Sequence, residues 1–195
     1  MKKLVGLTGK TGAGKSTISK YLQEKGAYII DGDIVARQVL TEDEKLLPRL
    51  CEAFGDILNM DGTLNRKALA RAAFSTSENT ELLNSLMHPA INDFIHKQAE
   101  KAFEKYDVVI VDAAAIIESG FADECDVMLV AHAPVDVRKS RIMARDNISE
   151  SDALVRINGQ KDDDFYLSRA DYVIRSYPPY ELKEELLPVV KELFD

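Results

Sequence analysis

A glycine-rich stretch near the start of the chain constrains the fold more than any other feature of the sequence. Gly9 to Ser16 has the pattern Gly-x-x-x-x-Gly-Lys-Ser; it follows the apolar run Leu4–Leu7 and opens a helical pattern. The glycines let the backbone curl so that successive N–H groups point inward, and the helix start adds the positive end of its dipole. A glycine-rich turn that arises by chance seldom has both an apolar strand before it and a helix after it. The stretch therefore predicts a phosphate-binding loop.

The residue types in this loop suit a nucleoside triphosphate that carries a magnesium ion. We expect Lys15 to reach the β- and γ-phosphates and the hydroxyl of Ser16 to bind Mg²⁺. Asp112 ends the apolar run Val108–Val111, a position from which a carboxylate holds Mg²⁺ directly or through water. A solvated aspartate at a strand end is the alternative. The loop residues expected to contact ATP are Gly12, Ala13, Gly14, Lys15, Ser16 and Thr17.

Five short apolar runs separated by helical patterns predict the fold class. They lie at residues 4–7, 27–30, 108–111, 127–130 and 172–174. Runs this apolar are typical of strands buried on both faces, so we expect an α/β protein with a three-layer, five-stranded parallel sheet. We expect a core formed by residues 1–40 and 106–195. Residues 41–105 carry only helical patterns and are expected to form an inserted helical region.

Capping residues predict the helices of the inserted region. Thr41-x-x-Glu44 is a capping-box pattern, which predicts a helix from there to about Phe54. Asn65 is expected to cap a helix over residues 66–74, and Ser77 a helix that ends near residue 86. Pro89 suits the first turn of a further helix that runs to about residue 105.

The charge balance and the cysteines exclude several classes of protein. The formal net charge is −8 over 195 residues, so broad binding to nucleic acid or to a membrane surface is not expected. Cys51 and Cys125 lie far apart, which predicts two core thiols in a reducing compartment rather than a disulfide or metal framework. No run approaches the roughly 20 apolar residues that span a bilayer, and the first residues lack a signal-peptide pattern. We therefore expect a cytoplasmic protein without membrane or nucleic-acid partners.

Two acidic residues just past the second predicted strand indicate an acceptor side. Ligands bind at the carboxyl ends of strands in open parallel sheets, so we expect Asp31 and Asp33 to face the γ-phosphate. A carboxylate there can orient a hydroxyl acceptor and take its proton; the alternative is a turn without chemistry. The sequence has no Asn-Lys-x-Asp motif for reading guanine. These features favour a small-molecule kinase.

Two arginines further along the chain suit the charge that develops in phosphoryl transfer. Arg141 and Arg145 lie four residues apart on one predicted helix face, so both guanidinium groups can converge on one anion. A pair of surface arginines is the alternative. Arg138, one turn earlier, could join them or stay solvated. His88, next to Pro89, could bind substrate, although a lone histidine is more often buried or capping.

Further segments match a single family of kinases. Asp31 to Arg37 reads Asp-Gly-Asp-Ile-Val-Ala-Arg, and Leu86 to Pro89 reads Leu-Met-His-Pro. Together with the loop, these segments resemble the dephospho-coenzyme A kinase family over nearly the whole chain. The Asp-x-Asp-x-x-Ala-Arg pattern is specific to that family among P-loop kinases. The matching segments are residues 7–17, 30–39, 61–69, 86–89, 141–146 and 170–174.

The resemblance implies a fold, a reaction and residue roles. The fold is similar to that of nucleoside-monophosphate kinases, with a core, a helical substrate-binding region and a lid at about residues 138–168. The implied reaction transfers the γ-phosphate of ATP, with Mg²⁺, to the 3′-hydroxyl of the ribose of dephospho-coenzyme A. Asp33 takes the general-base position, and the other implied catalytic residues are Lys15, Arg141 and Arg145, the two arginines lying on the lid near the ATP phosphates. The implied substrate contacts are Asp33, Arg37, Arg66, His88 and Glu118.

Three segments depart from the family's pattern. Residues 113–117 read Ala-Ala-Ala-Ile-Ile, without the usual proline and large leucines, so we expect the wall of the acceptor pocket to differ from that of the family. Residues 158–161 read Asn-Gly-Gln-Lys, where the family usually has an Ala-Gln pair and a basic residue. Residues 175–177 read Arg-Ser-Tyr instead of an Asp-Asn pair, in a segment near the adenine. The alternatives are a kinase for another ribose or small alcohol, and a nucleotide-binding regulatory protein that has lost transfer.

Overall fold

The chain divides into two structural units. The computed structural model describes residues 2–195. The first unit holds the chain up to Asp31 and from Ala99 to Asp195, and the second holds Gly32–Gln98. Within the described residues, no helix is both long and apolar enough to cross a membrane.

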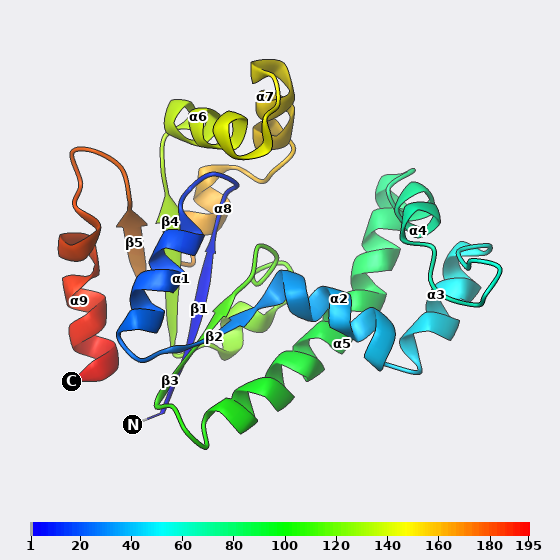
Figure 1. Cartoon of the computed structure of the whole chain (residues 1–195), viewed down its shortest axis with the longest axis horizontal. Coiled ribbons are helices and arrows are strands. Elements are labelled where there is room, and N and C mark those ends of the chain that lie inside the picture. The colour runs from blue at the N-terminus through cyan, green and yellow to red at the C-terminus, as the bar shows by residue number, and fades with distance from the viewer. Residues whose placement is uncertain (1) are drawn as a thin grey trace. The chain divides into compact units, whose positions relative to one another are not determined.

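A parallel sheet forms the centre of the first unit (Figure 1). Within residues 2–195 the sheet has five strands in the order β2-β3-β1-β4-β5, and every neighbouring pair is parallel. This confirms the fold class predicted from the apolar runs. The order reverses at β1, so the carboxyl end of that strand is a switch point, where open sheets of this kind bind ligands. The strands are β1 (Lys3–Gly9), β2 (Tyr28–Asp31), β3 (Val108–Asp112), β4 (Val127–His132) and β5 (Tyr172–Arg175).

Two helices cover one face of this sheet. They are α1 (Lys15–Glu24) and α9 (Leu182–Phe194), which lie on the same side of the strands in Figure 1. Ile18 and Leu22 of α1 and Leu186 and Val189 of α9 are fully buried against strand residues such as Leu7. Burial of this apolar stripe fixes the start of α1 directly behind the end of β1.

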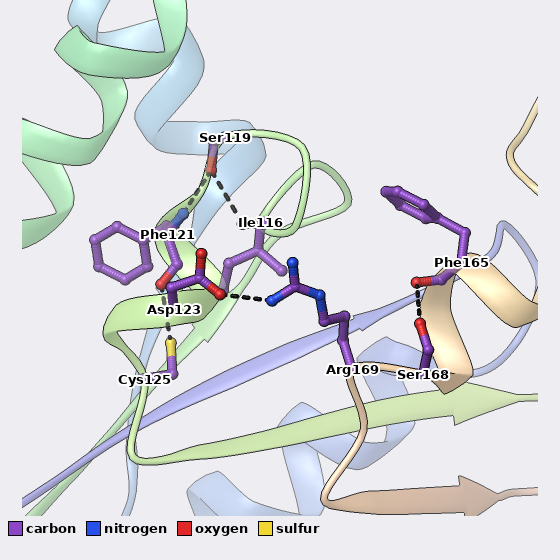
Figure 2. A network of polar contacts seen from close by, with 8 residues as sticks. All are labelled: Ile116, Ser119, Phe121, Asp123, Cys125, Phe165, Ser168 and Arg169. Atoms are coloured by element: carbon purple, nitrogen blue, oxygen red, sulfur yellow. Dashed lines mark hydrogen bonds and ion pairs between the residues drawn. The ribbon is translucent and has the colours of Figure 1, made fainter.

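The segment after β3 is tied to the C-terminal part of the first unit (Figure 2). It contains the short helix η1 (Phe121–Glu124), and Phe121 is fully buried. Asp123 pairs with Arg169, which follows α8 (Asp163–Leu167), at 2.6 Å. Cys125 lies just beyond η1 as a free thiol, and burial raises the pKa of that thiol to about 12. The remaining helices of this unit are α6 (Val135–Asp146) and α7 (Glu150–Asn158).

The second unit is helical. Asn65 caps α4 as predicted, since its side-chain oxygen accepts the N–H of Ala68 at 3.0 Å. A buried cluster of Val39, Leu46, Leu50, Ile57, Leu69 and Ala73 forms its core. Cys51, also a free thiol, packs against this cluster. The helices are α2 (Gly32–Glu42), α3 (Leu46–Phe54), α4 (Arg66–Ala73) and α5 (Ser77–Ala102), the last of which continues into the first unit.

The predicted break at Pro89 is wrong, because α5 is one continuous helix with Pro89 inside it. An internal proline removes one backbone hydrogen bond. Leu86 and Met87 before it, and Ile91 after it, all pack against the core of the second unit. Apolar burial on both sides of the proline therefore outweighs the local helix-breaking signal.

The predicted helix start at Thr41 is also wrong. Helix α2 continues to Glu42 and α3 begins at Leu46. The hydroxyl of Thr41 donates to the carbonyl of Gln38 at 2.9 Å. It therefore turns back into its own helix and does not cap the next one.

Candidate functional site

The predicted phosphate-binding loop leaves the end of the central strand β1. The N–H of Ala13 donates to the carbonyl of Lys10 at 3.0 Å, which closes a turn, and Gly12 has φ +78° within it. Gly14 has φ +106° and is the N-cap of α1. Since this N-cap has no side chain, it leaves the first amides of α1 to an anion.

The glycines of the loop also permit close approach by other parts of the first unit. A Cβ atom on Gly12 would lie 2.7 Å from the carbonyl oxygen of Arg138, and one on Gly14 would clash with the hydroxyl of Ser176. Both residues also have positive φ, which disfavours any side chain. The loop therefore requires glycine at these two positions, as loops whose backbone amides hold a phosphate group commonly do.

Arg141 contacts backbone carbonyls of the loop. Its guanidinium group donates to the carbonyls of Gly12 and Ala13 at 3.1 and 3.2 Å and to the carbonyl of Ser176. The hydroxyl of Ser176 donates to the carbonyl of Ala13 at 3.3 Å. These contacts give the carbonyls of Gly12 and Ala13 side-chain donors. Sequence reasoning identified Arg141 and missed Ser176, which lies in one of the segments that depart from the family's pattern.

Asp112 is positioned by the sheet beside the loop's own strand. Asp112 pairs in register with Leu7 of β1, and the hydroxyl of Ser19 donates to its Oδ2 at 2.5 Å. Ser19 is buried and lies one turn after Lys15 on α1. Asp112 and the exposed Ser16 supply a carboxylate and a hydroxyl, which are oxygen ligands of the type that Mg²⁺ binds together with substrate phosphates.

Glu118 directly follows residues 113–117, the segment whose sequence departs from the family's pattern. Partial burial raises the pKa of its carboxyl group, and the charge of Lys161 opposes that shift. The carbonyl of Ala114, in the same segment, accepts a hydrogen bond from the hydroxyl of Thr8 at 3.2 Å. The small residues after β3 therefore remain attached to the strand that carries the loop.

Arg145 does not join Arg141 at the loop in this structure. Its Nε and Nη2 donate to the two carboxylate oxygens of Asp146, each at 2.8 Å, and its side chain is 60% exposed. Arg156 of α7 donates to the same carboxylate. Asp146 is therefore the partner of two arginines, and the predicted convergence of Arg141 and Arg145 on one anion stays a prediction.

The second unit carries the remaining predicted residues. Asp33 lies in the first turn of α2, and Arg37 follows four residues later on the same helix face; both are exposed. The guanidinium group of Arg66 lies 3.5 Å from the backbone carbonyl oxygen of Arg37. This contact joins the start of α4 to α2. Burial lowers the pKa of His88, so this imidazole is largely neutral at pH 7.

The family model and the similar curated relatives indicate one family. The family model for dephospho-CoA kinase matches residues 3–177. The dephospho-CoA kinase of Corynebacterium jeikeium is 42% identical over 173 residues, which cover 87% of this chain and 88% of that relative. The structure of the dephospho-CoA kinase from Campylobacter jejuni is 25% identical, with a TM-score of 0.70 over 98% of this chain and 97% of that chain. Shikimate kinase from Acinetobacter baumannii, in complex with shikimate, is 14% identical with a TM-score of 0.52 over 99% of this chain and 94% of that chain, and shares the fold.

Proposed function

The chain belongs to the dephospho-CoA kinase family, and on that premise we propose how its residues carry out the family's reaction. The reaction moves the γ-phosphoryl group of ATP to the 3′-hydroxyl of the ribose of dephospho-CoA and yields CoA and ADP. The observation that carries the proposal is the loop from Gly9 to Thr17, which leads into α1 at the switch point of the sheet. Arg141 donates hydrogen bonds to two carbonyls of this loop.

The loop and Lys15 hold the phosphates of ATP. In this proposal the amides at the start of α1 and the Lys15 ammonium group bind the β- and γ-phosphate oxygens. Ser16 and Asp112 are the residues that would hold Mg²⁺, and the ion would supply positive charge to those oxygens. Ser19 orients the Asp112 carboxylate through its hydroxyl. Arg141 and Arg145 stabilise the charge on the transferring group.

Asp33 is the general base in this proposal. Its carboxylate is exposed at the start of α2, two residues after the end of β2. The proton of the acceptor hydroxyl passes to Asp33 while the oxygen bonds to the γ-phosphorus. The bond from that phosphorus to the β–γ bridging oxygen breaks, and ADP leaves. The residues that hold the acceptor are Arg37, Arg66, His88 and Glu118.

The test is turnover with ATP, Mg²⁺ and dephospho-CoA, followed by coupled detection of ADP. Asp33→Asn should lower kcat by roughly 10²-fold or more and leave the affinity for ATP nearly unchanged, because the amide cannot take the proton. Glu42→Gln, at the exposed far end of the same helix, is the control and should retain most of the activity. Unchanged turnover in Asp33→Asn would remove Asp33 from the role of base.

A panel of other ribose-containing and small alcohols tests the acceptor. The altered segment at residues 113–117 makes this comparison informative, since it lies next to Asp112. Preferred turnover of another alcohol would assign a different acceptor. ATP binding without ADP formation on any acceptor would favour a regulatory protein.

A further inference from the structure

The turn at the tip of the phosphate-binding loop, residues Lys10–Ala13, is held from outside by the part of the chain that follows β4. The ammonium group of Lys10 lies 2.7 Å from a carboxylate oxygen of Asp163, and Arg141 donates to the carbonyls of the last two residues of the turn. Gln160 makes a contact of a different kind: its Oε1 accepts the backbone N–H of Thr11 at 2.8 Å. Arg141 thus donates hydrogen bonds to carbonyls of the loop, whereas Gln160 accepts a hydrogen bond from a backbone N–H of the loop.

The geometry of the turn explains why this amide matters. The bond from the Ala13 N–H to the Lys10 carbonyl, together with φ +78° at Gly12, identifies a type II turn with Thr11 at its second position. The N–H of Thr11 belongs to the peptide group that enters the turn. When Gln160 accepts that N–H, it fixes the plane of this peptide and hence the direction of the amides that follow in the cradle.

Gln160 is itself held in a short connection between two helices. Helix α7 ends at Asn158, and the N–H of Gly159 donates to the carbonyl of Val155 at 3.0 Å. Two residues after Gln160, the carboxylate of Asp162 accepts the N–H of Phe165 at 2.9 Å and caps α8. A connection this short and capped at both ends has little freedom to move its middle residue.

The next residue along, Asp163, adds a second point of attachment. It pairs with Lys10, the residue that precedes Thr11. Two consecutive loop residues are therefore held by two residues three positions apart, Gln160 in the α7–α8 connection and Asp163 at the start of α8. This arrangement transmits any displacement of the connection to the entry of the loop.

We propose that Gln160 is a positioning residue for phosphoryl transfer, which orients the phosphate-binding amides by holding the N–H of Thr11. The proposal rests on the proposed function in that the loop's ligand is the phosphate of ATP or ADP. Gln160 does not touch the nucleotide in this role. Its effect on nucleotide binding passes entirely through the Thr11 amide. A mutant that lacks the Thr11 N–H can therefore distinguish this role from direct nucleotide binding and from packing.

A double-mutant cycle on ADP affinity, measured by titration calorimetry, tests the proposal. Gln160→Met keeps the length of the side chain and removes the acceptor, so it should weaken ADP binding about three- to tenfold, the usual value of one hydrogen bond. Thr11→Pro removes the donor and suits the second position of a type II turn. In the Thr11→Pro background, Gln160→Met should change ADP affinity by less than about twofold.

Two results of the double-mutant cycle would overturn the proposal. One is an equal loss from Gln160→Met in both backgrounds, as direct nucleotide contact or packing would give; the other is no loss in the wild-type background. Amide hydrogen exchange provides a second readout: the Thr11 amide of the ADP complex should exchange faster in Gln160→Met, and unchanged exchange also counts against the role. Neither measurement uses an acceptor substrate. An error in the role of Asp33 or in the identity of the acceptor would therefore show in the turnover assay and not in these two measurements.

Discussion

The hydroxyl of Ser19 lies 2.5 Å from Oδ2 of Asp112 and joins the first helix of the chain to the end of β3. Ser19 is 8% exposed, and its oxygen also lies 3.1 Å from the carbonyl of Lys15. The contact therefore links the helix that begins at the phosphate-binding loop to the carboxylate that we propose holds Mg²⁺. It orients one oxygen of that carboxylate.

Ser19→Ala should disturb both stability and the response to Mg²⁺. Loss of a buried hydrogen bond lowers the free energy of unfolding by about 1 kcal/mol, which corresponds to a fall in Tm of about 2–4 °C at this size. The Mg²⁺ concentration at half-maximal velocity should rise several-fold, because the carboxylate loses an orienting donor. Ser19→Thr retains the hydroxyl and is the control. A lower Tm with an unchanged Mg²⁺ dependence would limit Ser19 to a structural role.

Arg141 and Arg145 should differ in what they do for bound nucleotide. Arg141 already contacts the loop carbonyls of Gly12 and Ala13, and a lysine cannot reproduce the planar fork of donors. Arg141→Lys should therefore weaken ADP affinity about tenfold. Arg145 is paired with Asp146, so Arg145→Lys should leave ADP affinity within about twofold and lower kcat. Equal effects of the two substitutions on ADP affinity would contradict this difference.

The fold was predictable where the signal is local. The five strands are short, almost purely apolar runs, and the loop has a fixed spacing, so neither needs distant information. Strand order is different, because the pairing of β1 with both β3 and β4 depends on where the crossover helices pass. The helix through Pro89 shows the opposite limit, since burial of Leu86 and Ile91 in the second unit overrides the local signal of a proline.

Positioning residues were less predictable than the loop itself. Ser19 had a usable signal, because it lies four residues after Lys15 and hence on the same face of α1. Gln160 and Ser176 had no such signal from spacing, because they contact the loop from 149 and 163 residues away in the sequence. A side chain that acts on the backbone of a distant loop leaves no periodicity or spacing to detect.

Residues of the second unit should affect the acceptor and not the nucleotide. Arg37→Met and Arg66→Met remove positive charge while keeping much of the side chain's length. Each should raise KM for dephospho-CoA about tenfold or more, as loss of a charge-assisted contact to an anionic substrate does, with KM for ATP within about twofold. Lys67→Met, on an exposed neighbour in α4, is the charge-matched control. A parallel rise in KM for ATP would contradict an acceptor-specific role.

The pair of Arg175 and Glu185 predicts a pH-dependent part of the stability. The guanidinium group donates to both carboxylate oxygens at 2.9 and 3.0 Å, and the backbone N–H of Arg175 donates at 3.1 Å. The hydrogen bonds from the Arg175 side chain are the main cause of the lowered pKa of Glu185. Because the folded pKa is depressed, the stabilisation is present above the unfolded pKa of about 4.3 and is lost as the pH falls through the folded value.

Urea unfolding of Glu185→Gln at two pH values measures this contribution. At pH 7 the variant should be less stable than the wild type by about 1 kcal/mol, a value kept small because the Arg175 side chain is 40% exposed. Near pH 3 the difference should shrink, since protonation of Glu185 weakens the wild-type pair as well. Glu184→Gln, at an exposed position in the same turn of α9, should stay within about 0.5 kcal/mol of the wild type at both pH values. A gap for Glu185→Gln that is equally large at pH 3 and pH 7 would show that it comes from packing and not from the charge.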